Sequence, residues 1–177
     1  ASFRIQPSYW NFDGYAEYGV KSNEDVQSQV FHDDEWKIGE AFYGSLNFYY
    51  DIFSIVGEYK YYDNYAFTSN DGTIFYNTAP SLRKEYTYQL LNRHPSPLDQ
   101  SNEEGYAVEI NYNFSDETSL IANYGITNTL PTSSYYQRVN NLSLPIATQL
   151  EEVYLQASHN WSKSLTSILA FGYNQEL

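Results

Sequence analysis

The residues that most constrain the fold run from 42 to 63, where the side chains alternate in character from one position to the next. Up to residue 50, the even-numbered positions carry Phe42, Gly44, Leu46, Phe48 and Tyr50, and the odd-numbered positions between them are mostly polar. After residue 52 a second alternating run carries Phe53, Ile55, Gly57, Tyr59 and Tyr61. Successive side chains of a strand point to opposite faces, so this period of two predicts two antiparallel strands joined by a tight turn. Each arm has about the 9–11 residues that a tilted strand needs to cross a bilayer.

The same unit recurs along the chain. Further strands are expected at residues 12–20, 106–114, 118–127, 153–161 and 165–173, and a weaker one at 2–10, where Pro7 removes a backbone donor. Short connections fall near residues 11, 52, 116 and 163, and long ones at 21–40, 64–104 and 128–151. In an antiparallel meander this alternation puts every long loop at one end, as in outer-membrane barrels. The prediction is an all-β, antiparallel up-and-down transmembrane β-barrel, or part of one, with about eight strands in a single domain, residues 1–177.

The distribution of aromatic residues agrees with a membrane location. Aromatic residues make up 19% of the chain, and 20 residues are tyrosine, whose apolar ring and polar tip suit a water–lipid interface. One group of aromatics lies beside the short turns, another beside the long loops, and aliphatic residues lie between them. Two aromatic girdles around an aliphatic belt are typical of a membrane barrel. A membrane helix is not expected, since no apolar run approaches the ~18 residues it needs.

The alternation also assigns side chains to the two faces of the predicted wall. The lipid-facing set is Leu46, Ile55, Ile110, Leu120, Leu155 and Leu169. The charged residues expected to face the lumen are Glu17, Glu58, Lys60 and Glu109. These charges have two interpretations: a pore lining that selects solutes, or a set of mutually paired side chains that closes a narrow interior. In the second case the interior is filled by Tyr15, Tyr43, Tyr49, Tyr62 and Tyr154.

Several classes of function are not expected from this composition. The net charge of −13 argues against nucleic acid as a partner, and the lack of cysteine excludes disulfides and thiolate metal sites. No catalytic motif is recognisable, so we expect no enzyme, no catalytic residues, no cofactor and no metal. The acidic run from His32 to Glu35 lacks calcium-loop spacing and is interpreted as a solvated loop tip. His94 and His159 are interpreted as structural residues.

The segment from Arg83 to His94, followed by Gly105 and Tyr106, is similar to a loop-to-strand passage in an uncharacterised family of barrels of Bacteroidota-type bacteria. The resemblance implies a bacterial outer-membrane location and no known reaction. The implied partners are the lipid bilayer and lipopolysaccharide, with other membrane-protein chains as further candidates. Members of that family are longer than 177 residues, and the final residues lack the terminal aromatic of bacterial barrels. The chain is therefore expected to be either a mature exported barrel or a fragment of a larger one, and these two features favour a fragment.

Two roles follow from an outer-membrane barrel: porin-like passive transport, or a structural or surface platform. The alternative outside a membrane is a secreted, soluble, Tyr-rich β-sandwich that binds carbohydrate by aromatic stacking. Such a sandwich would use some of the same tyrosines. It would leave an apolar belt exposed to water without explanation.

Overall fold

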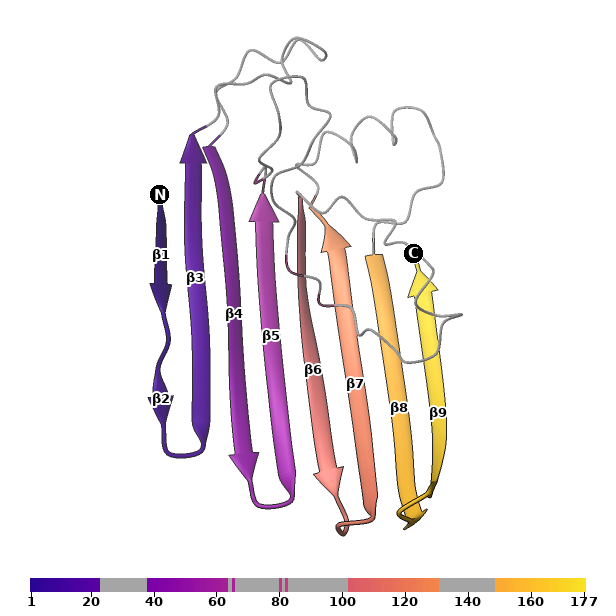
Figure 1. The fold of residues 1–177 in the computed structure, drawn as a ribbon. Coiled ribbons are helices and arrows are strands. Elements are labelled where there is room, and N and C mark those ends of the chain that lie inside the picture. Colours follow the sequence, from indigo (N-terminus) through magenta and orange to yellow (C-terminus); the bar gives the residue numbers. More distant parts are fainter. Residues whose placement is uncertain (23–37, 64, 66–79, 81, 83–101, 131–148) are drawn as a thin grey trace.

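The computed structural model describes residues 1–22, 38–63, 65, 80, 82, 102–130 and 149–177. Their nine strands form a single antiparallel sheet, in which β3 to β9 are neighbours in chain order (Figure 1). The strands are β1 (Ser2–Ile5), β2 (Ser8–Tyr9), β3 (Phe12–Ser22), β4 (Ile38–Tyr50), β5 (Phe53–Asp63), β6 (Glu103–Asn113), β7 (Thr118–Thr129), β8 (Gln149–Ser162) and β9 (Leu165–Glu176). β1 and β2 both pair with β3, on either side of Pro7. The expected all-β, antiparallel, up-and-down arrangement is therefore confirmed.

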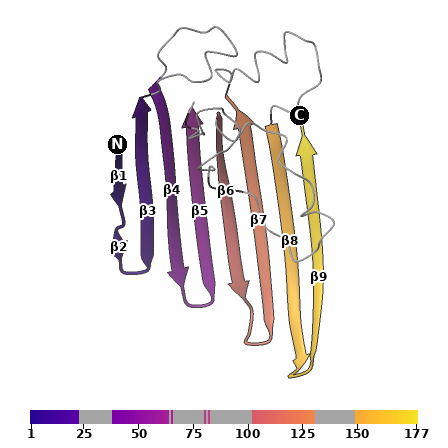
Figure 2. The ribbon, with the colours of Figure 1, turned by 45° about the horizontal axis from the view of Figure 1, so that its top comes forward.

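The described strands form an open sheet. β1 and β9 lie at its opposite edges, and their pairings are with β3 and β8 respectively, not with each other (Figures 1 and 2). The closure that a barrel requires is thus not formed among the described residues.

The strands extend further than the apolar alternation indicated. β3 continues to Ser22, β4 begins at Ile38, β6 at Glu103 and β8 at Gln149. The predicted loops 21–40, 64–104 and 128–151 therefore include several residues at these ends that belong to strands. Ladder hydrogen bonds join main-chain groups, so a strand continues through polar residues after its apolar pattern has stopped. Most of each predicted loop lies outside the described residues.

The four predicted short turns are confirmed. They join β2 to β3, β4 to β5, β6 to β7 and β8 to β9, and all lie at one end of the sheet, the lower end in Figure 1. Trp10 and Asp51 lie in two of these turns with positive φ values of 53° and 48°. This left-handed conformation is what tight hairpin turns require.

The register shows that the sheet has two chemically different faces. Directly opposed residues share a face, and one row across the sheet reads Phe12, Phe48, Ile55, Ile110, Ala122, Leu155 and Phe171. The neighbouring row, on the other face, reads Asp13, Asn47, Val56, Glu109, Asn123, Tyr154 and Gly172. We call these the apolar face and the polar face.

Burial is concentrated on the polar face. The buried strand residues there include Ala41, Tyr62, Ala107, Leu150 and Tyr154, together with Lys60, Glu103, Asn123 and Glu152. Large side chains of the apolar face are exposed instead, with Leu169 at 78%, Leu46 at 55% and Leu155 at 45%. The described residues contain no helix of the length and apolarity needed to span a membrane.

Candidate binding pocket on the polar face

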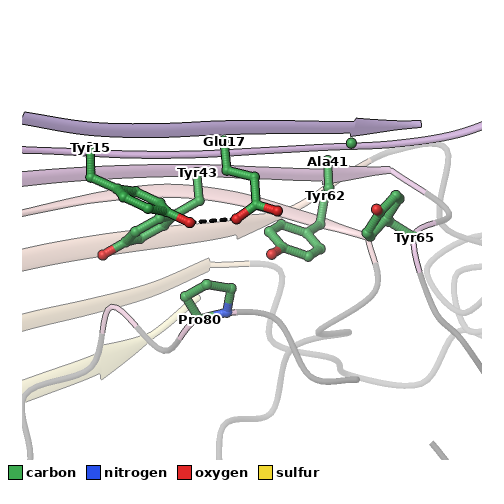
Figure 3. Close-up of a pocket in the computed structure, with 8 residues that line it drawn as sticks. Tyr15, Glu17, Ala41, Tyr43, Tyr62, Tyr65 and Pro80 are labelled. Carbon is green, nitrogen blue, oxygen red and sulfur yellow. Dashed lines mark hydrogen bonds between the residues drawn. The ribbon is translucent and has the colours of Figure 1, made fainter. Parts of the chain in front are cut away.

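A cavity of about 380 Å³ lies on the polar face of β3, β4 and β5, towards the end of the sheet opposite the short turns. Register explains how the strands build it: Glu17 is opposite Tyr43, and Ala41 is opposite both Gly19 and Tyr62. The full lining is Tyr15, Glu17, Gly19, Ala41, Tyr43, Tyr62, Tyr65 and Pro80 (Figure 3).

Small residues leave the space that the tyrosines enclose. Gly19 and Ala41 are neighbours across β3 and β4 and contribute little or no side chain. A Cβ atom built on Gly19 would lie 2.3 Å from the hydroxyl oxygen of Tyr65. Only glycine at position 19 therefore lets the Tyr65 side chain lie where it does.

The four tyrosine rings form walls of different orientation. The rings of Tyr15 and Tyr43 have centroids 5.9 Å apart and planes at 56°. The rings of Tyr62 and Tyr65 are 5.8 Å apart and nearly perpendicular, at 83°. Both separations are typical of favourable aromatic pairs. Because the planes differ so much, the rings enclose a space and do not form one flat stacking platform.

Glu17 is held by two hydrogen bonds that end on the same oxygen. Its Oε2 accepts one from the Tyr15 hydroxyl and one from Arg4 Nη2, the latter at 3.2 Å. The Arg4 guanidinium carbon also lies 5.7 Å from the centroid of the Tyr15 ring, within cation–π distance. The Arg4 side chain is 60% exposed, so this ion pair belongs to the surface. Glu17 Oε1 has no hydrogen-bond partner among the described residues.

The other two carboxylates predicted to face the lumen lie on the same face as Glu17. Glu58 Oε1 accepts a hydrogen bond from the Tyr43 hydroxyl, and Glu109 Oε1 accepts one from Asn111 Nδ2 at 3.1 Å. Each of the three is therefore bonded to a residue of its own or a neighbouring strand. These local hydrogen bonds are compatible with the second sequence interpretation, and the closed interior that it describes stays a prediction.

Lys60, the fourth predicted charged residue, is buried in an ion pair with Glu103. The two residues are only 4% and 2% exposed, and Lys60 Nζ also donates to the Pro80 carbonyl oxygen at 3.1 Å. Sequence reasoning missed Glu103, which it placed in a loop. It also missed Tyr65 and Pro80. A fully buried lysine is almost always paired, but neither the burial of Lys60 nor its partner can be found without the register between β5 and β6.

All six residues predicted to face lipid lie on the apolar face: Leu46, Ile55, Ile110, Leu120, Leu155 and Leu169. Their contact with lipid stays a prediction.

Two histidines, His94 and His159, are interpreted from the sequence as structural residues, and His159 lies in β8. Its Nδ1 is 2.8 Å from Thr118 Oγ1 and its ring packs edge-on against Trp161, at 4.4 Å between centroids. These contacts agree with a structural role. His94 and the acidic run 32–35 lie outside the described residues. Within the described part of the chain, no group of three or more His, Cys, Asp or Glu residues is arranged to hold a metal ion.

Fold and pocket define an antiparallel up-and-down β-sheet protein with one face apolar and an aromatic, acidic cavity on the other. The chain matches the model of a family of unknown function, DUF6029, over residues 1–176, and it belongs to that family. No curated protein and no solved structure matches it. The family description names no activity, so the resemblance to barrels of Bacteroidota-type bacteria stays a prediction.

Proposed function

We propose that this chain forms part of the wall of a β-barrel in a bacterial outer membrane, with its apolar face towards lipid and its polar face towards the interior. The observation that carries the proposal is the exposed apolar face. Aromatic and aliphatic side chains such as Phe12, Leu46 and Phe171 lie exposed on it from one edge region of the sheet to the other. A contiguous apolar surface of this extent is unfavourable in water and marks an interaction surface. Lipid removes that cost.

The stagger of the strands gives independent support. In the row that crosses the sheet from Phe12 to Phe171, Phe12 is the first residue of β3, whereas Phe171 lies six positions beyond Leu165, the first residue of β9. The offset is thus close to one residue for each step between strands. With a rise of about 3.4 Å per residue and a spacing of about 4.8 Å between strands, the strands tilt by about 35° if the turns mark one plane. Membrane barrels have tilts of about 35–45°.

The proposal requires that both edges of the sheet be paired in the membrane. Unpaired N–H and C=O groups at the edge of β9 would have no water to bond with in a bilayer. The partner strand is β1, a strand from a longer form of this chain, or a strand from another membrane-protein chain. Each choice closes the sheet and keeps the same face towards lipid.

Of the two roles expected for such a barrel, the contacts on the polar face favour a structural or surface platform over a porin. The carboxylates that would line a pore are bonded to neighbouring side chains. Pro80 and the buried Leu82 lie over β5 to β7 near the loop end, where Lys60 and Glu103 are buried. A carbohydrate-binding sandwich is less well supported, since it requires two facing sheets and the described strands form one.

Membrane extraction tests the location. The protein in its native cells should stay in the outer-membrane fraction after washing with urea or carbonate and should require detergent for release. Unheated and boiled samples should migrate differently in gel electrophoresis, because a barrel keeps its structure in detergent until heated. Release by urea without detergent would contradict the proposal.

Reconstitution into planar bilayers tests the role. A platform should insert, as shown by heat-modifiable mobility of the recovered protein, and should conduct no ions. Steady conduction that prefers potassium over chloride, and loses that preference in a Glu58→Gln, Glu109→Gln double variant, would restore passive transport as the function.

A further inference from the structure

The lining of the cavity has a one-sided electrostatic character. Of its eight residues, Glu17 alone carries a charge at neutral pH, and it is negative. The four tyrosines add ring faces, each of which carries the negative part of the aromatic quadrupole. The cavity is therefore complementary to a positively charged ligand.

Two polar atoms of the cavity are available to such a ligand. Glu17 Oε1 has no hydrogen-bond partner among the described residues, and in Figure 3 the second carboxylate oxygen points away from Tyr15. The hydroxyl of Tyr62 likewise has no hydrogen-bond partner in the described part of the chain, although the residue is only 9% exposed. A carboxylate oxygen accepts a charge-assisted hydrogen bond, which is about twice as strong as a neutral one.

Glu17 and Tyr15 already bind one guanidinium group, that of Arg4. Arg4, from the edge strand β1, lies at the rim, where it donates to Glu17 Oε2 and approaches the ring of Tyr15. Arg4 is not part of the cavity lining and is largely exposed. It therefore leaves the cavity and Glu17 Oε1 open, and it can compete with a second cation for the same carboxylate.

We propose that this cavity binds a small organic cation with N–H donors, a guanidinium or primary ammonium compound. The cation donates to Glu17 Oε1 and to the hydroxyl oxygen of Tyr62, and it lies against the rings of Tyr15 and Tyr43. A sugar would require an open, flat ring to stack on, whereas the ring pairs here are tilted or perpendicular. This site goes beyond the proposed membrane role and does not depend on it, because it needs only the pairing of β3, β4 and β5 and the packing of Tyr65 and Pro80 against them.

An NMR titration of the purified, folded full-length protein with methylguanidinium tests the proposal, with N-methylurea as the uncharged ligand of similar shape. Methylguanidinium should bind saturably and at least about tenfold more tightly than N-methylurea, because only the cation forms a charge-assisted bond. Glu17→Gln should weaken methylguanidinium binding by about tenfold or more. Glu109→Gln, on the same face outside the cavity, should leave it unchanged. Arg4→Gln should tighten binding, since it removes the competing guanidinium.

Equal affinity for methylguanidinium and N-methylurea would overturn the proposal, as would an affinity unaffected by Glu17→Gln. Saturable binding of methyl glucoside with none of methylguanidinium would replace the cation site by a sugar site. Circular dichroism identifies any variant that fails to fold. If Glu17→Gln is one of these, Tyr62→Phe serves instead, because it removes a single hydroxyl and should weaken binding a few-fold.

Discussion

The two faces of this sheet are built by the same strands but stabilised in different ways. On the polar face, side chains such as Tyr43 with Glu58 and Lys60 with Glu103 are paired by directional bonds. On the apolar face, large side chains lie side by side in rows and remain exposed. The cost of a substitution should therefore depend on the lost partner on the polar face and, if the proposed membrane location is correct, on depth in the bilayer on the apolar face.

The largest effect is expected from separating the buried ion pair. Lys60→Met removes the ammonium group that pairs with the buried Glu103 carboxylate, and should lower the free energy of unfolding by about 3–5 kcal/mol. A Lys60→Met, Glu103→Leu double variant should recover much of that loss, because neither charge of the pair is then left buried. Urea unfolding of the detergent-folded protein measures both. A single variant as stable as the parent would show that the pair contributes nothing.

A matched pair of arginine substitutions compares the faces directly. Ile110 and Asn111 are consecutive in β6, so they have nearly the same height in the sheet but point to opposite faces. Ile110→Arg should cost roughly 2–4 kcal/mol if it faces lipid near the middle of the bilayer, and Asn111→Arg should cost far less. Equilibrium unfolding from lipid vesicles measures the difference. Equal penalties would contradict the proposal that the apolar face contacts lipid.

The smallest of these effects is expected from removing one hydroxyl on each face. Tyr43→Phe deletes the hydrogen bond to Glu58 and should cost about 1 kcal/mol. Tyr59→Phe is the control, because Tyr59 lies on the apolar face of the adjoining strand and its hydroxyl has no hydrogen-bond partner among the described residues. The unfolding midpoints of the two variants measure the difference. If Tyr59→Phe loses as much stability as Tyr43→Phe, the hydrogen bond to Glu58 does not explain the loss.

The strands could be predicted from the sequence because the alternation of apolar and polar residues shows both that a segment is a strand and which side chains lie on each face. It located the turns at residues 11, 52, 116 and 163, and it grouped Glu17, Glu58, Lys60 and Glu109 on one face. It could not predict the cavity, which depends on residues from the connection between β5 and β6, Tyr65 and Pro80, meeting the face of β3 and β4. Nor could it predict the pairing of Lys60, because Glu103 lies in a polar stretch where the alternation is not visible.

Within the sheet, every pairing among β3 to β9 joins strands that follow each other in the chain, and this has a consequence for assembly. The entropy cost of closing a loop rises by about 0.6 kcal/mol for each doubling of its length. Hairpins β4–β5, β6–β7 and β8–β9 close over short turns and should form first, whereas β5 meets β6 only across residues 64–102. The molecule is in this sense a series of modules. Each hairpin brings its own turn, its own internal register and a strip of both faces, so a lineage can gain or lose one hairpin while the rest of the sheet keeps its pattern.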